Sequence, residues 1–113
     1  MDKKIIDEIL KFRDDRNWKQ YHNPKDLAIS ISLEAAELLD NFQWTSWEEA
    51  VAKKKDMLAE ELADVLMYCI LMADSIGLDL DQIIRSKIEL NKKKYPADKV
   101  YGRKDKYSEY DKS

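Results

Sequence analysis

Two pairs of acidic residues carry the clearest chemistry in this sequence of 113 residues. Glu34 and Glu37 form one pair, and Glu61 and Asp64 form the other. Each pair has i, i+3 spacing, which places both side chains on one face of a helix. Four oxygen ligands without a neighbouring cysteine or histidine favour a hard cation over zinc. The two pairs therefore predict a site for Mg²⁺, with Mn²⁺ as a possible substitute.

Basic residues that would neutralise these acids are scarce nearby. No lysine or arginine occurs between Asp26 and Ala52, or between Asp56 and Ile84. Apolar neighbours such as Leu38 and Val65 indicate that the acids lie within or beside inward-facing helix surfaces. A buried carboxylate without compensation costs several kcal/mol. An external cation explains this pattern, although the spacing by itself also fits a solvated acidic face.

Other metal sites agree less well with the sequence. A ferritin-type di-iron bundle requires Glu-x-x-His pairs, and the single histidine, His22, lies outside both acidic segments. Cys69 is the single cysteine, so this chain has neither an intrachain disulfide nor a thiolate zinc cluster. Because Cys69 lies in an apolar run, we expect a buried free thiol.

Long helices are expected to position these residues. Two glycines and two prolines are few, which favours helices over a many-stranded sheet. Asn23 followed by proline predicts one helix start, and Ser46 with Glu49 forms a capping box that predicts another. Gly77 and Pro96 mark two helix ends. The predicted helices cover residues 2–16, 23–41, a short segment from 46, 56–76 and 79–95.

The overall composition indicates one folded helical domain at residues 1–96 followed by a polar tail at 97–113. Charged residues make up 38% of the chain and apolar residues 44%, a mixture typical of folded proteins. A net charge of −3 does not favour binding to a nucleic acid polymer. No apolar run approaches the roughly 20 residues that cross a bilayer, and no signal-peptide stretch begins the sequence. We therefore expect a cytoplasmic protein.

The segment from Val65 to Ala73 is apolar on every helical face, unlike an amphipathic surface helix. A monomer of this size offers few apolar helices to surround it. We therefore expect the segment to be buried against another subunit of a dimer or tetramer. The alternative is a helix that is central within a single four-helix bundle.

Four segments together resemble the MazG-like all-α nucleoside triphosphate pyrophosphohydrolases, and most closely their dCTP pyrophosphatase branch. The resemblance implies an all-α four-helix bundle that assembles as a dimer or tetramer. Leu33 stands where the family pattern E-E-x-x-E has its first glutamate, which leaves the number of metal ions open. The matching segments are FRDDRNWKQYHNPKDL (12–27), LEAAELLDNFQW (33–44), EELADVLMY (60–68) and SKIELNKKKYP (86–96).

The resemblance also implies roles for individual residues. The family's magnesium ligands match Glu34, Glu37, Glu61 and Asp64. Its K-x-x-x-N-x-x-[RK]-Y stretch, which contacts phosphate and the metal site, matches Lys87, Asn91, Lys94 and Tyr95. Its nucleoside-binding surface matches His22, Trp44 and Tyr68. The alternatives are a loop histidine without a task, tryptophans packed in the core and lysines that complement a helix dipole.

The activity implied by the resemblance is hydrolysis of the α–β phosphoanhydride of a nucleoside triphosphate, to the monophosphate and pyrophosphate. The substrate implied is dCTP or a modified pyrimidine analogue, with a role in cleaning the nucleotide pool. Glu37 or Glu60 would accept a proton from water, Glu61 would hold the metal, and Lys87 would stabilise charge on the triphosphate. The alternatives are a non-catalytic helical interaction module and a metal-dependent nucleotide-binding regulator.

Overall fold

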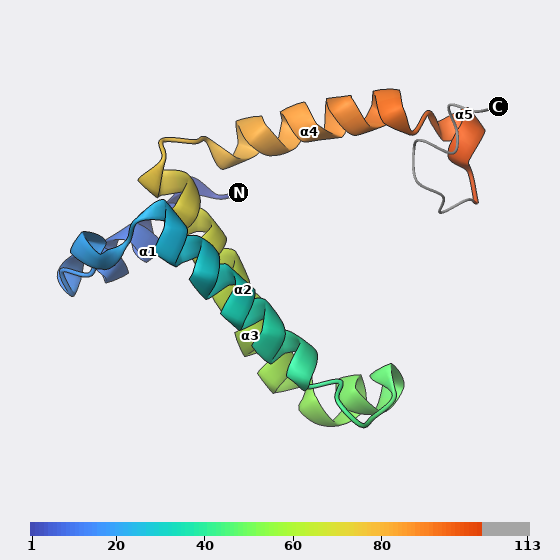
Figure 1. Cartoon of the computed structure of the whole chain (residues 1–113), viewed down its shortest axis with the longest axis horizontal. Helices are drawn as coiled ribbons and strands as arrows, with labels where there is room; N and C mark the ends of the chain where they lie inside the picture. The colour runs from blue at the N-terminus through green and yellow to red at the C-terminus, as the bar shows by residue number, and fades with distance from the viewer. Residues whose placement is uncertain (103–113) are drawn as a thin grey trace. The chain divides into compact units, whose positions relative to one another are not determined.

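Helices account for all the regular structure in residues 1–102, the part of the chain that the computed structural model describes (Figure 1). The all-α prediction is therefore confirmed for these residues. Much of the predicted tail, residues 103–113, lies outside the described residues. In chain order the elements are α1 (Lys3–Asp15), the 3₁₀ helix η1 (Lys19–Tyr21), α2 (Pro24–Asp40), α3 (Trp47–Ser75), α4 (Leu80–Lys94) and α5 (Ala97–Val100).

The chain divides into two compact units, one of residues 1–78 and a second that begins at Asp79. The first unit contains α1, η1, α2 and α3, and the second contains α4 and α5. Each unit is described by itself, so the four-helix bundle and its assembly stay predictions.

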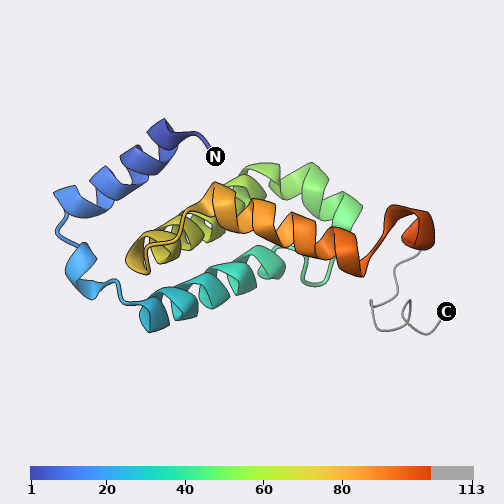
Figure 2. The ribbon, with the colours of Figure 1, turned by 90° about the horizontal axis from the view of Figure 1, so that it is seen from above.

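In the first unit, α2 and α3 lie side by side and antiparallel, and α1 packs against α3 (Figures 1 and 2). Most buried apolar side chains come from the start of α2, the middle of α1 and the end of α3, namely Leu27, Ile9, Ile70, Leu71 and Ala73. Ala50, near the start of α3, is buried as well. The core therefore lies where the beginning of α2 meets the end of α3, with α1 beside it.

Arg13 links α1 to the end of α3. Its side chain is buried, with 4% of the residue exposed. Arg13 Nη1 donates to Asp74 Oδ2 at 2.7 Å, and Nε donates to Asp14 Oδ1 at 2.8 Å. A buried guanidinium is costly unless it is paired and hydrogen-bonded. The two carboxylates therefore hold Arg13, and with it α1, in one position.

Most helix ends are confirmed as predicted. The side chains of Asp2, Asn23, Ser46 and Asp79 each accept a hydrogen bond from a backbone N–H in the first turn of the following helix. Gly77 follows α3 with a φ of 71°, a left-handed conformation that favours glycine.

The predicted short helix that begins at Ser46 is confirmed as a distinct segment at the start of α3. The backbone of Lys54, with φ −124° and ψ 25°, is not helical and forms a kink that separates this segment from the longer helix predicted from residue 56. No proline or glycine occurs between Ser46 and Gly77, so the chain resumes helical geometry directly after the kink.

Several large apolar side chains stay exposed on the paired helices of the first unit. Leu33 is 61% exposed, Leu39 68% and Leu66 46%, while Cys69 is half-buried rather than buried as expected. Within the first unit, α1, α2 and α3 by themselves therefore leave much of the apolar surface of α2 and α3 uncovered. No described helix is long and apolar enough to span a membrane.

The cap at Asn23 provides a test of the first unit. Asn23 Oδ1 accepts a hydrogen bond from the backbone N–H of Asp26 at 2.9 Å. We expect Asn23→Ala to lower the free energy of unfolding by about 1 kcal/mol, because the N–H loses its acceptor. Asn23→Ser keeps a capping oxygen and should stay close to wild type. Urea unfolding followed by circular dichroism measures both, and equal losses would contradict the capping role.

Candidate functional site

The four predicted acidic ligands come together across α2 and α3. Burial, followed by a hydrogen bond with Glu37, raises the pKa of the Glu34 carboxyl. The negative charges of Glu37, Asp64 and Glu61 raise that pKa further. Residues on two helices thus act on one carboxyl group, an approach between helices that the i, i+3 spacing within each pair does not by itself predict. We call Glu34, Glu37, Glu61 and Asp64 the acidic cluster.

The acidic cluster has no cation of its own. None of the ion pairs in residues 1–102 involves its members. Glu61 Oε2 is buried without a hydrogen-bond partner. Carboxylate oxygens of this kind fit Mg²⁺. However, no three His, Cys, Asp or Glu side chains among the described residues are already arranged to hold a metal ion. The donor chemistry therefore fits the metal, while the coordinating geometry is not preformed.

A cavity of about 240 Å³ adjoins the acidic cluster through Asp64. Its walls come from α1, from the segment between α1 and α2, and from α3. Three polar residues, Arg13, His22 and Asp64, line it together with the apolar and aromatic side chains of Ile9, Phe12, Trp18, Met67, Tyr68 and Leu71. An apolar cavity with a few polar groups is the usual form of a small-molecule site.

His22 is held neutral in this cavity. Burial, and then the positive charge of Arg13, lowers the pKa of the imidazole from its ordinary value of 6.5. The neutral form therefore predominates at neutral pH, with one ring nitrogen a donor and the other an acceptor. Nδ1 is buried and has no hydrogen-bond partner among the described residues. A ligand in the cavity would supply a partner for this atom.

The aromatic wall of the cavity is built by the end of α1 and the turn that follows. Phe12 and Trp18 meet edge to face, with ring centroids 5.7 Å apart and an interplanar angle of 76°. The Arg16 guanidinium lies 3.6 Å from the centroid of the Phe12 ring. The turn between them contains Asn17 at φ 54°, a left-handed conformation that asparagine tolerates. This wall can accept a planar ring by stacking.

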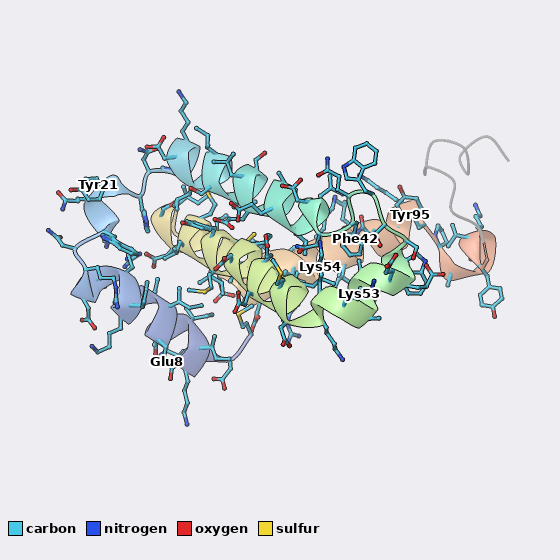
Figure 3. All side chains as sticks on the ribbon, turned by 90° about the horizontal axis from the view of Figure 1, so that it is seen from below. Glu8, Tyr21, Phe42, Lys53, Lys54 and Tyr95 are labelled. Atoms are coloured by element: carbon cyan, nitrogen blue, oxygen red, sulfur yellow. The ribbon has the colours of Figure 1, made fainter. Side chains whose placement is uncertain are left out.

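Trp44 does not lie with His22 and Tyr68. It stands in the loop after α2, is 95% exposed, and lines a separate pocket with Lys53 and Lys54. His22 precedes α2, whose 17 residues extend about 25 Å at about 1.5 Å per residue. Figure 3 labels Tyr21 near one end of this unit and Lys53 near the other. Within one chain, His22 and Trp44 are therefore separated by about the length of α2.

The remaining predicted residues belong to α3 and to the second unit. Glu60 is exposed on α3 beside Glu61. Lys87, Asn91 and Lys94 lie on α4, and Tyr95 caps the end of this helix, where its N–H donates to Asn91 O at 2.7 Å. Lys87 and Asn91 are exposed, whereas Lys94 and Tyr95 are half-buried.

Sequence reasoning missed Arg13 and Phe12 as cavity residues. One signal was available for Arg13, which follows Ile9 by four residues and so lies on the apolar face of α1. A basic residue on a face that packs inward requires partners, and the distant Asp74 supplies one.

Comparison with known proteins gives consistent results. The sequence model of the MazG-like family matches residues 29–110. Over 104 residues, 88% of this chain, the sequence is 35% identical to dCTP pyrophosphatase 1 of Mus musculus and 33% identical to that of Homo sapiens. The chain spans only 61% of the length of either relative. A crystal structure of a pyrophosphatase from Archaeoglobus fulgidus DSM 4304 superposes with a TM-score of 0.78 and 42% identity, covering 82% of this chain and 90% of that one.

The raised pKa of Glu34 predicts how stability depends on magnesium. Without metal, the folded state binds the Glu34 proton more tightly than the unfolded state. This stabilisation is complete below the unfolded pKa and is lost as pH rises through the folded pKa. We therefore expect Glu34→Gln to raise the unfolding temperature at neutral pH without metal.

The same substitution should weaken stabilisation by Mg²⁺, which for wild type is about 2.7 kcal/mol at about 100 times the dissociation constant. Thermal unfolding with and without MgCl₂ measures both effects. The matched control is Glu48→Gln, at an exposed position in the first turn of α3. Equal stabilisation of Glu34→Gln and wild type by Mg²⁺ would exclude Glu34 as a ligand.

Proposed function

Since the chain belongs to the MazG-like family, we propose that it is a magnesium-dependent nucleoside triphosphate pyrophosphohydrolase of the cytoplasm. The observation that carries this proposal is the position of Asp64, which belongs to the acidic cluster and also lines the aromatic cavity. A metal-binding group and a space for a planar base thus adjoin. This arrangement is what a nucleotide with a metal-bound phosphate chain requires.

The substrate we propose is dCTP or a modified pyrimidine analogue, which would be cleaved to the monophosphate and pyrophosphate. The support is the name of the mammalian relatives, dCTP pyrophosphatase 1. The cavity volume of about 240 Å³ is small and would suit a single ring. Removal of a modified nucleotide from the pool is the corresponding cellular role.

In this proposal, different residues bind the metal, accept the proton of water and contact the substrate. Glu34, Glu37, Glu61 and Asp64 hold the metal, which supplies charge neutralisation for phosphate oxygens and a lower pKa for bound water. Glu37 or Glu60 receives the proton of the attacking water at a carboxylate oxygen. His22 and Tyr68 contact the nucleoside in the cavity. The roles of Lys87, Asn91, Lys94 and Tyr95 in phosphate contact rest on the family resemblance.

A second copy of the chain forms part of the proposal. The exposed leucines of α2 and α3 provide an apolar surface for another subunit. Trp44 stacks on a base held beside His22 only if it comes from a neighbouring copy, because α2 separates the two residues within one chain. A homodimer or homotetramer would satisfy both requirements.

A non-catalytic metal- or nucleotide-binding module is the second candidate. Its nucleotide-binding form is favoured by one observation: the described residues contain no preformed metal-binding group, and such a module would not need one. The two candidates share the fold and the acidic cluster, so only turnover distinguishes them.

Pyrophosphate release from a panel of deoxynucleoside triphosphates with Mg²⁺ tests the activity. We expect dCTP or a 5-modified analogue to be cleaved fastest. Glu61→Gln should reduce kcat at least about 100-fold, because it removes a ligand of the metal that would neutralise the developing phosphate charge. Glu48→Gln should retain wild-type turnover. Folded wild-type protein that binds Mg²⁺ but releases no pyrophosphate from any triphosphate would leave the second candidate.

Light scattering at micromolar concentration tests the assembly. A single chain has a mass of 13.4 kDa. We expect a particle of two or four times that mass, because exposed leucines on α2 and α3 would otherwise remain in water. A particle with the mass of one chain would refute the proposed oligomer and the contribution of Trp44 to a neighbouring site.

A further inference from the structure

Arg13 lines the cavity, and its side chain is held in one position by its neighbours. It lines the cavity together with Trp18 and His22. Only 4% of the residue is exposed, and its guanidinium contacts two carboxylates, from Asp14 and Asp74. The hydrogen bond to Asp14, and then that to Asp74, outweighs burial and raises the pKa of Arg13, so the group stays protonated. Its plane is therefore held in place before any ligand arrives.

The two ion pairs do not use every donor of Arg13. A guanidinium has five N–H bonds in a rigid planar fork. Nε donates to Asp14 and Nη1 donates to Asp74, whereas Nη2 donates to no atom of residues 1–102. One N–H of Nη1 and both N–H bonds of Nη2 therefore remain for a molecule in the cavity, and Nη2 is the nitrogen that takes part in no ion pair.

The charges around Arg13 indicate which kind of hydrogen-bond acceptor Nη2 can bind. The carboxylates of Asp14 and Asp74 offset the positive charge of Arg13. The acidic cluster joins the cavity at Asp64, so a metal-bound phosphate chain belongs on that side. A guanidinium already paired with two acids is poorly suited to a phosphate. It is well suited to a neutral acceptor, such as a carbonyl oxygen on a ring.

We propose that Arg13 is a specificity-determining residue that donates a hydrogen bond from Nη2 to the O2 carbonyl of a pyrimidine base in the cavity. The inference rests on the proposed function and assigns its base selectivity to one side chain. Every pyrimidine nucleotide carries O2, including those modified at C5, whereas adenine has no ring carbonyl. His22, whose Nδ1 lacks a partner in the same cavity, provides a second polar contact for the ring.

The proposal is tested by the binding of dCMP, 2-thio-dCMP and 2-deoxyribose 5-phosphate to wild-type protein, measured by calorimetry. Sulfur accepts hydrogen bonds more weakly than a carbonyl oxygen. We expect wild type to bind dCMP about tenfold more tightly than 2-thio-dCMP, which corresponds to about 1.4 kcal/mol, near the upper end for one hydrogen bond. Equal affinity of the two nucleotides, or no binding of dCMP, would overturn the proposal without any mutation.

Arg13→Gln should abolish the preference for dCMP over 2-thio-dCMP while leaving the affinity for 2-deoxyribose 5-phosphate unchanged. The matched control is Lys11→Gln, which removes a positive charge from an exposed position on the same helix and should keep the preference. If Arg13 only supported the fold, Arg13→Gln would weaken all three ligands by the same factor. That result, or a retained preference for dCMP, would overturn the assignment.

These binding measurements can fail separately from the proposed function, because they require no turnover. Discrimination by Arg13 without pyrophosphate release would refute the enzymatic activity and leave the base contact intact. Pyrophosphate release from dCTP with no discrimination by Arg13 would refute the base contact alone. If Arg13→Gln does not fold, equal affinity of wild type for dCMP and 2-thio-dCMP still overturns the proposal.

Discussion

Repulsion among the carboxylates that face one another across α2 and α3 is the constraint on which the first unit depends. Apolar packing of the two helices brings these acids together, and the described residues provide no cation to separate them. Burial, and then the neighbouring carboxylates, raise the pKa of Glu34, and the buried Oε2 of Glu61 has no hydrogen-bond partner among the described residues. The same packing that forms the core thus brings carboxylates together, and an external positive charge would lower the free energy of this arrangement. In the proposed function, stability and activity are coupled at this point, because the ion that would relieve the repulsion is also the one that would bind the phosphate chain.

Features set by neighbouring residues were predictable from the sequence. The caps at Asp2, Asn23 and Asp79 follow from short polar side chains that accept backbone N–H groups a few residues later. The pairing of acids on each helix follows from spacing alone. The short helix from Ser46 and the longer helix from residue 56 were predicted as separate segments, and the non-helical backbone of Lys54 divides them.

Features that depend on packing between distant segments were not predictable in the same way. The contact between Arg13 and Asp74 spans 61 positions, so neither residue reveals the other. The resemblance grouped His22 with Trp44 because both match one functional surface. The helix α2 lies between them, and its length places them at its opposite ends within a single chain. Periodicity predicts which face of a helix packs inward, but it does not predict which helix will cover that face.

The bond between Arg13 and Asp74 also has a consequence for the order of folding. It closes a loop that contains nearly the whole first unit, and closing a loop of this length carries a large entropic cost. Contacts between α2 and α3, joined by a short turn, close a much smaller loop and can form first. The docking of α1 is then a late event, and the cavity is completed only when it occurs. During synthesis, the N-terminal wall of the cavity therefore waits for a residue at the far end of α3 to leave the ribosome.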